Sequence, residues 1–200
     1  CRPRHVGKTT RSEVLMRTAI KLLVLLVLFS FPVRADEAPL DDVRAVMAVN
    51  IFAKSCFLNM GDMQKTEAFL NDQFQKHDDR KKQPFLDFTK TKTGDVWLAV
   101  GAQGIYAIVL ADNGNCHVVA QKASREAVHH HMGNLEKQAR ENLDYAINAH
   151  EITTGSATKS SGFDVVDPDG GNLMTIVAST PIERSIDKPD TVITMAISSY

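Results

Sequence analysis

Hydrophobic residues are concentrated in the middle of the chain, between residues 94 and 121. Their pattern predicts three antiparallel strands, at 96–100, 105–111 and 116–121. Tight turns separate these strands, and the Asn113-Gly114 pair in the second turn favours the positive φ angles of a hairpin. Strand 105–111 contains no charged residue, which is typical of a central strand covered by helices on at least one face. We therefore expect the fold to be built around this meander.

Amphipathic helices are predicted on both sides of the meander. Two helices precede it, at Leu40–Leu58 and from Asp62 to about Phe74. The side of the first helix that we expect to face the core consists of Val43, Met47, Ile51 and Leu58. A long helix follows the meander from Arg125 to about Ala146, with Ser124 as its N-cap. Its apolar stripe consists of Val128, Met132, Leu135, Ala139, Leu143 and Ala146.

The last fifty residues return to a strand pattern. Strands are predicted at 150–154, 163–166, 173–179 and 191–198, with a loop at 155–161 and a turn at 167–172. Residues 85–88 are predicted either to form a short edge strand or to pack over the sheet. Because the strands cluster instead of alternating with helices, the fold class is α+β: an antiparallel sheet of about six strands, packed by the long helix and the N-terminal helix pair.

The first 35 residues have the pattern of an export signal. Residues 16–21 are basic, residues 22–31 are uniformly apolar, and Ala35 is a small residue at the end. The apolar run is about half the ~20 residues that a membrane-spanning helix needs. We therefore expect residues 16–35 to be a signal peptide cleaved between Ala35 and Asp36, with residues 1–15 lying upstream of it. Residues 36–200 would then be one globular domain in the periplasm, without a stable membrane anchor.

Removing residues 1–35 changes the charge balance. The whole chain has 23 Lys+Arg and 24 Asp+Glu, and the first 35 residues hold 7 basic residues and 1 acidic residue. Residues 36–200 therefore carry 16 basic and 23 acidic residues, a net charge of −7. This balance argues against nucleic acid or an anionic membrane surface as the partner.

Two cysteines, Cys56 and Cys116, lie in the predicted domain. An even count in an oxidising compartment predicts that they form a disulfide. The alternative is two free thiols buried as small apolar side chains.

Four groups of residues are candidates for a chemical site. His129, His130 and His131 are consecutive, so on a helix they point about 100° apart and cannot converge on one metal ion. Cys116 and His117 are neighbours on a strand and therefore point to opposite faces. The serines at 160–161 lie in the predicted loop without a nucleophile elbow, and the acidic turn at 167–172 has only half of a calcium loop. We assign no catalytic residue, metal site or cofactor.

Trp97 is the single tryptophan of the chain. It alternates with its two neighbours, so it faces away from them. A buried core position is expected for it, with the floor of an exposed groove as the alternative.

A set of residues spread along the chain resembles an uncharacterised family of small exported proteins and lipoproteins of Gram-negative bacteria. The set consists of Cys56-Phe57, Gly61-Asp62, Trp97, Gly101, Gly104, Cys116 and Val118. The resemblance covers about residues 45–178 and implies a location in the cell envelope, but no active-site residue. Some members resemble lipoproteins, with a Cys directly after the signal. Here Asp36 follows Ala35, which implies a soluble protein.

These observations lead to a first functional hypothesis. We expect a soluble periplasmic binding or protein-interaction module without catalysis, whose partner is another envelope protein, as for an inhibitor or immunity-type factor, or a small ligand. The alternative is a periplasmic hydrolase whose active site is assembled only in the fold, from His117, His150 or one of the histidines 129–131. A passive structural protein of the envelope is a third possibility. The sequence leaves these three alternatives open.

Overall fold

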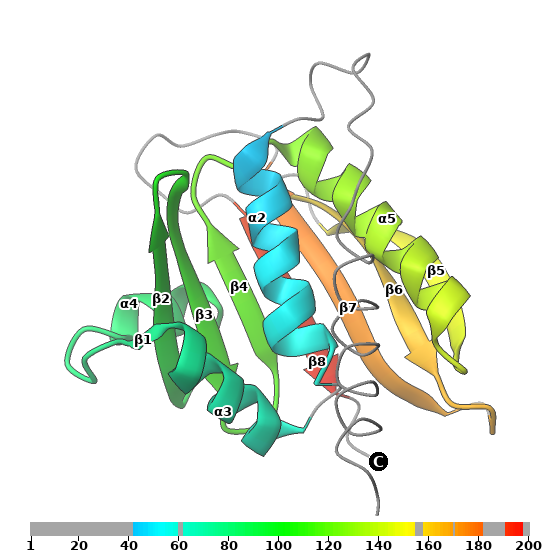
Figure 1. The fold of residues 1–200 in the computed structure, drawn as a ribbon. Coiled ribbons are helices and arrows are strands. Elements are labelled where there is room, and N and C mark those ends of the chain that lie inside the picture. Colours follow the sequence, from blue (N-terminus) through cyan, green and yellow to red (C-terminus); the bar gives the residue numbers. More distant parts are fainter. Residues whose placement is uncertain (1–41, 60–61, 155–157, 170, 182–190, 198–200) are drawn as a thin grey trace, which may run out of the picture. The chain divides into compact units, whose positions relative to one another are not determined.

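The computed structural model describes residues 42–59, 62–154, 158–169, 171–181 and 191–197. These residues form one open antiparallel sheet of eight strands with helices packed on it (Figure 1). The α+β prediction is confirmed, whereas the expected number of about six strands was too low. The predicted signal peptide, with Ala35 and Asp36, lies outside the described residues.

The helices and strands have the following bounds. The described helices are α2 (Val43–Phe52), the π-helical turn η1 (Ala53–Phe57), α3 (Met63–Gln73), α4 (Gln83–Phe88) and α5 (Arg125–Asn142). The strands are β1 (Gln75–Lys76), β2 (Gly94–Gly101), β3 (Gly104–Ala111), β4 (Cys116–Ala120), β5 (Ala146–Thr154), β6 (Thr158–Val166), β7 (Asn172–Pro181) and β8 (Thr191–Ile197). None of these helices has the length and hydropathy required to cross a membrane.

The sheet consists of two meanders that meet in its centre. The strand order is β1-β2-β3-β4-β8-β7-β6-β5, so each meander begins at an outer edge and ends where β4 pairs with β8. Each meander also follows a helix, α2 in the first half and α5 in the second. The two helices lie side by side on the same face of the sheet (Figure 1). The strand expected at 191–198 is thus a central strand, inside the sheet as predicted.

Asp42 connects the starts of the two long helices. Its carboxylate accepts a hydrogen bond from the backbone N–H of Arg44, at 3.0 Å, in the first turn of α2. It also accepts one from the backbone N–H of Ser124. Ser124 in turn is the N-cap of α5, as predicted, because its hydroxyl accepts from the N–H of Ala127. The guanidinium of Arg44 donates to the carbonyl of Lys122, at 3.2 Å, and so also joins the start of α2 to the segment before α5.

The buried side of α2 differs from the prediction. Val43 and Met47 are 47% and 39% exposed, and Leu58 is exposed beyond the end of η1. Ile51 is buried as expected, together with Ala45, Ala48, Val49 and Phe52. The helix packs against both the sheet and α5, and small residues permit the close approach that this requires. The prediction relied on the large apolar side chains, and it therefore assigned the wrong side of α2 to the core.

The segment at 83–88 forms α4 and not an edge strand. Pro84 lies in the first turn of this helix, where no backbone N–H is needed. Leu86 is buried on the face of the sheet opposite α2, in a cluster with Val96, Val109 and Val119. The alternative that these residues pack over the sheet is thus confirmed, although the helix was not foreseen.

The long helix agrees with the prediction over most of its length. Its stripe of Val128, Met132, Leu135 and Ala139 is buried. The helix ends at Asn142, so Ala146, which was expected in its last turn, instead begins β5. The prediction was wrong here because the strand pairing of Ala146 with Val166 overrides the helical preference of alanine.

β6 occupies part of the segment that was predicted as a loop. Residues 158–161 belong to this strand, and they pair with β5 on one side and β7 on the other. Gly162 is needed in it, because a Cβ there would lie 2.0 Å from the carbonyl oxygen of Ile176. The polar composition of the segment suggested a loop, but a strand paired on both sides forms without hydrophobic alternation.

Trp97 is completely buried on the helix-covered face of the sheet. Its indole N–H donates to the side-chain oxygen of Asn71 on α3, at 3.0 Å. The ammonium of Lys76 lies 5.2 Å from the ring centroid. The expected core position is therefore confirmed, and Trp97 does not form the floor of an exposed groove.

Candidate functional site

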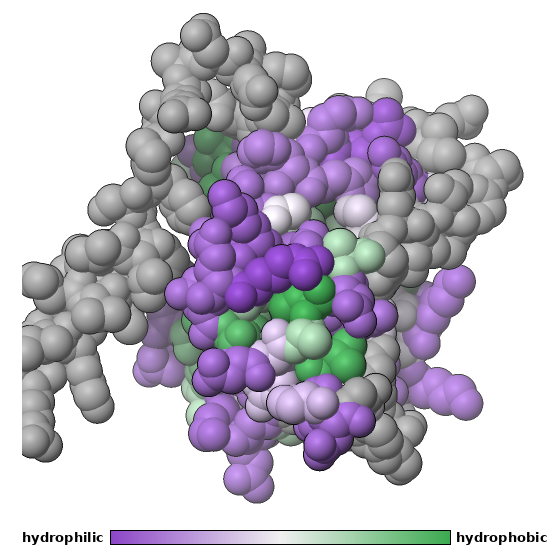
Figure 2. All heavy atoms as spheres, turned by 90° about the vertical axis from the view of Figure 1, so that its right-hand side faces the viewer, coloured by the Kyte–Doolittle hydropathy of each residue, from purple (hydrophilic) through white to green (hydrophobic). Residues whose placement is uncertain are grey.

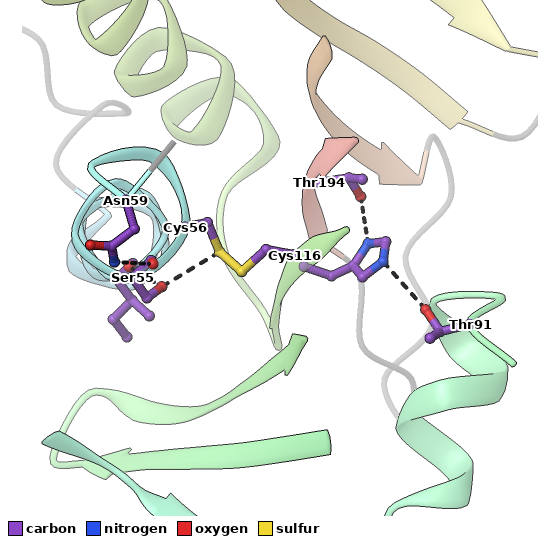
Figure 3. The surroundings of a disulfide bond; sticks show 8 residues. Ser55, Cys56, Asn59, Thr91, Cys116 and Thr194 are labelled. Atoms are coloured by element: carbon purple, nitrogen blue, oxygen red, sulfur yellow. Dashed lines mark hydrogen bonds between the residues drawn. A yellow bond between two sulfur atoms is a disulfide. The ribbon is translucent and has the colours of Figure 1, made fainter. Parts of the chain in front are cut away.

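A disulfide joins Cys56 to Cys116, with the two Cα atoms 5.7 Å apart (Figure 3). Both residues are fully buried. The bond connects η1 to the first residue of β4 and so attaches the N-terminal helical segment to the centre of the sheet. The Ser55 hydroxyl donates to the carbonyl of Ile51 at 2.6 Å, and the Asn59 amide donates to the carbonyl of Ser55 at 2.8 Å. The pair is the one that the sequence predicted, so the two cysteines are not free thiols.

His117 lies on the opposite face of the sheet from this disulfide, as the strand geometry predicted. Its ring is buried between the hydroxyl groups of Thr194 and Thr91. Nδ1 lies 3.0 Å from the Thr194 hydroxyl on β8, and Nε2 lies 3.3 Å from the Thr91 hydroxyl after α4. Burial lowers the pKa of His117 from 6.5 to about 4, because the charged ring would lose its hydration. The ring is therefore neutral at pH 7 and has a structural role.

His129 on α5 also lies between two hydroxyl groups, both from the sheet beneath the helix. Nδ1 lies 2.5 Å from the Ser161 hydroxyl on β6, and Nε2 lies 3.0 Å from the Thr180 hydroxyl on β7. The Thr180 hydroxyl donates its hydrogen to the carbonyl of Lys159, at 3.4 Å. It can then only accept from His129, which places the ring proton on Nε2 and leaves Nδ1 to accept from Ser161. Ser161 and His129 thus have the arrangement of a hydroxyl and its base.

A pocket of about 300 Å³ opens beside this pair, between α5 and strands β5 and β6. Its lining includes His129, Ser161, Met132, Phe163 and Glu136. The Glu136 carboxylate is engaged by the Arg140 guanidinium at 2.8 Å, and both ring nitrogens of His129 already face hydroxyls. A Ser-His-acid triad is therefore not formed by these residues.

Figure 2 views the side on which α5 and β5 lie in Figure 1, and it shows hydrophobic residues gathered in the middle of that face with hydrophilic residues around them.

The three histidines of α5 do not act together. While His129 contacts the sheet, the rings of His130 and His131 contact each other edge to face, with centroids 5.3 Å apart. Across the described ranges, no group of three or more His, Cys, Asp or Glu side chains is arranged to hold a metal ion.

The acidic turn after β6 has a structural role. The Asp167 carboxylate accepts from the N–H of Asp169, and the N–H of Asp167 donates to the carbonyl of Gly171, both at 2.8 Å. These bonds are local to the hairpin turn that the sequence predicted between β6 and β7.

A second, larger concavity of about 450 Å³ lies beside the β2–β3 hairpin. We call it the hairpin groove. Its walls are formed by α2, the end of α3, β1 and the hairpin itself, and its apolar lining includes Met47, Phe74, Leu98, Ala99, Val100 and Tyr106. The described residues that line it include no charged side chain. The turn of the hairpin is tight because Gly104 adopts a φ of +142°, which other residues rarely do.

A buried tyrosine hydroxyl, that of Tyr106, lies beside the hairpin groove. Tyr106 is buried, and its hydroxyl has no hydrogen-bond partner among the described residues. Burial raises the pKa of Tyr106, the Asp42 carboxylate acts in the same direction, and Arg44 opposes them. The phenol is therefore protonated at neutral pH and can donate. An unpaired buried hydroxyl costs about 1–3 kcal/mol, which a bound acceptor would remove.

Sequence reasoning did not identify Tyr106 or Ser161 as site residues. Tyr106 lies in a strand whose apolar pattern indicated core, and only the tertiary structure shows that its hydroxyl, beside a groove, has no partner among the residues described. Ser161 meets His129 across 32 positions of the sequence. The sequence signal for this pair was the hydrolase alternative, in which one of the histidines 129–131 meets a serine in the fold.

Compared with models of protein families, with curated proteins and with solved structures, the chain matches none.

Proposed function

We propose that the protein is a non-catalytic binding module that holds its ligand or partner in the hairpin groove. The observation that carries this proposal is the buried hydroxyl of Tyr106, which has no hydrogen-bond partner within the described ranges, beside a groove whose described lining carries no charge. Ligand sites combine an apolar lining with a few placed polar groups, and the groove has both. The ligand class that fits is an apolar group next to a hydrogen-bond acceptor.

The setting that we propose for this activity is the bacterial periplasm. The segment at 16–35 and the resemblance to exported proteins support it, and so does the disulfide, because such bonds persist in oxidising compartments. A partner from the envelope, as for an inhibitor or immunity-type factor, suits this setting. Mass spectrometry of the protein recovered from a periplasm should give a chain that begins at Asp36; a product that retains Met16 would contradict the proposal of export with cleavage.

The binding proposal is tested with fragments that combine an apolar ring with a carbonyl acceptor. Binding in the hairpin groove should shift the NMR signals of the Met47 methyl group and of the amides of Ala99 and Tyr106. Tyr106→Phe should weaken binding of the carbonyl fragments by about tenfold, which corresponds to about 1.4 kcal/mol, the scale of one hydrogen bond.

A matched pair of variants serves as the control for these fragments. Ala99→Trp should abolish their binding by filling the groove, whereas Leu58→Trp, which places the same side chain at an exposed position elsewhere, should leave binding unchanged. Fragment shifts that are unaffected by Ala99→Trp would refute the hairpin groove as the site.

A second candidate function, hydrolysis, rests on the pair of Ser161 and His129. With Nδ1 of His129 free of a proton, the ring can take the hydrogen of the Ser161 hydroxyl while Oγ attacks an electrophilic carbon or phosphorus atom. The pocket beside the pair offers space for the electrophile.

The hydrolase candidate is tested with a fluorophosphonate probe. In this reaction the Oγ–P bond forms, the P–F bond breaks, fluoride leaves and His129 receives the proton. Labelling at Ser161 that is lost in His129→Gln and retained in Ser160→Ala would support hydrolysis, because Ser160 pairs with Ser179 away from His129. Absence of labelling at Ser161 under conditions that label an active serine hydrolase would contradict it.

A further inference from the structure

The edge of β2 next to the hairpin groove is only partly covered. β1 pairs with β2 at two positions, Gln75 with Leu98 and Lys76 with Trp97. One further bond follows, from the N–H of His77 to the carbonyl of Val96, at 2.7 Å. Within the described ranges, no strand pairs with residues 99–101 on this side.

The ladder identifies which backbone groups are left open. In an antiparallel pair, alternate residues direct both N–H and C=O toward the same neighbour. Val96 directs its carbonyl toward the β1 side, so Leu98 and then Val100 follow with the same orientation. Leu98 is paired with Gln75, whereas Val100 lies past the end of β1. As far as the described part of the chain goes, the N–H and C=O of Val100 are therefore open to a further strand.

Within the part of the chain that the structure describes, the segment at 99–101 lacks the usual protection of a sheet edge. Natural edges are shielded by charged residues, prolines, bulges or covering elements. Residues 99–101 are Ala, Val and Gly, without charge or proline, and Val100 is 72% exposed. Its cross-strand neighbour Ile105 is 53% exposed, so the two form an apolar pair at the end of the hairpin. The same edge is thus open in its backbone and apolar in its side chains.

The ion pairs of β1 keep the covered part of the edge in place. Lys76 lies 2.7 Å from the Asp95 carboxylate, and Lys82 lies 3.2 Å from it. The pKa of Asp95 is lowered, chiefly by the hydrogen bond from Lys76. β1 is thus attached beside residues 95–98, and the next stretch of β2 begins where this attachment ends.

We propose that this edge binds an extended, apolar peptide segment of a partner protein, which adds a strand to β2 in line with β1. Successive side chains of a strand point to opposite faces. One face of the added strand meets the hairpin groove, with Ala99, Met47 and Tyr106, and the other lies beside the exposed pair of Val100 and Ile105. A peptide backbone also supplies carbonyl groups, and the Tyr106 hydroxyl has no such acceptor among the described residues. This inference rests on the proposed function and names the class of partner for the same site.

The peptide is expected to be neutral or basic. The open stretch itself carries no charge, but residues 36–200 together carry a net charge of −7, which attracts basic partners over longer distances. Main-chain hydrogen bonds would provide part of the affinity, and the side chain seated in the groove would provide selectivity.

The probe for the experiment is a short acetylated peptide with valine and threonine alternating between two terminal lysines. Added to the isotope-labelled protein, it should shift the amide signals of residues 99–101 and slow hydrogen exchange at the Val100 amide by at least about tenfold. A copy of the peptide N-methylated at alternate amides, on the side that would face β2, should bind at least about tenfold more weakly. Copies methylated on the other side should bind as the parent does.

Two protein variants give a matched comparison. Val100→Pro removes the open N–H and should abolish peptide binding, whereas Val100→Thr keeps the N–H and the β-branched shape and should bind the peptide within about threefold of the parent. Because Val100 is exposed and at an edge, both variants should keep the far-UV circular dichroism spectrum of the parent.

The outcomes separate this inference from the proposed function. If acceptor fragments bind the hairpin groove but the peptide does not, or if N-methylation has no effect, strand addition is refuted. The hairpin groove then remains the proposed ligand site. If neither fragments nor peptide bind there, both proposals fall. If sedimentation shows a dimer that Val100→Pro dissolves, the edge serves a second copy of this chain, and the partner-peptide proposal is overturned.

Discussion

The two halves of the sheet have the same topology but are fastened to their helices by different means. In the first half, the disulfide between Cys56 and Cys116 links the α2–η1 segment to β4. In the second half, α5 is fastened by side-chain packing and by His129, whose ring contacts Ser161 on β6 and Thr180 on β7. One half therefore has a covalent link, and the other has hydrogen bonds that exist only when helix and sheet are in place.

This difference has a consequence for stability. A disulfide acts largely by restricting the unfolded chain, so it stabilises whatever the exact packing around it. A histidine between two hydroxyls contributes only in its native geometry, and its loss leaves the Ser161 and Thr180 hydroxyls with fewer partners. The first half should therefore depend on the redox state and the second half on the packing of α5.

The largest effect is expected from Leu135→Asp in the second half. Leu135 is buried in the stripe of α5, and an unpaired carboxylate there should destabilise by about 5 kcal/mol or more. Urea unfolding followed by circular dichroism measures this loss. A small effect would mean that packing of α5 is not what fastens the second half.

Replacing both cysteines, as Cys56→Ala with Cys116→Ala, should cost about 4 kcal/mol. The disulfide closes a loop with a sequence separation of 60, for which the chain-entropy model gives that value. Hydrogen exchange measured by mass spectrometry should then accelerate more in α2 than in α5. Equal acceleration in the two helices would mean that the disulfide stabilises the whole sheet and not the first half in particular.

His117 should make the protein less stable in mild acid. Above pH 6.5 its ring is neutral in both states; as the pH falls from 6.5 to about 4, the unfolded chain binds a proton that the folded ring does not. Stability is therefore lost across this window, by on the order of 3 kcal/mol, and no further below it. Urea unfolding at several pH values should show this slope, and His117→Gln should remove it. An unchanged slope in that variant would exclude His117 as the cause.

His129→Gln should destabilise by about 1–2 kcal/mol, because two neutral hydrogen bonds are changed. A double-mutant cycle with Ser161→Ala should give a coupling of about 1 kcal/mol. A coupling near zero would mean that the ring and the Ser161 hydroxyl do not support the attachment of α5.

The smallest effect is expected from Glu136→Ala on α5, at the half-buried rim of the pocket beside His129. Its partner is Arg140, one turn further along the helix, and such pairs contribute about 0.3–0.5 kcal/mol. The unfolding midpoint in urea should therefore shift only slightly. An effect comparable to that of Leu135→Asp would mean that the two faces of the helix have been confused.

The elements that depend on local patterns could be predicted from the sequence. The meander at 94–121, the N-cap Ser124, the stripe of α5 and the opposite orientations of Cys116 and His117 all follow from turn chemistry and from periods of two and 3.6 residues. The pairing of the cysteines followed from their number and from the expected compartment. These features need no knowledge of what lies beside each element.

The features that depend on which elements become neighbours could not be predicted in this way and are seen in the folded protein. The exposure of Val43 and Met47 results from packing of α2 against α5, and the polar segment before Gly162 becomes a strand because partners pair with it on both sides. The sequence shows no repeat, yet its two halves share one topology. The contact of His129 with Ser161 likewise arises between residues far apart in the chain, and the burial of the Tyr106 hydroxyl without a partner in the described ranges depends on the elements packed around it. Hydrogen bonding and burial at such sites are set by long-range packing, which no local pattern encodes.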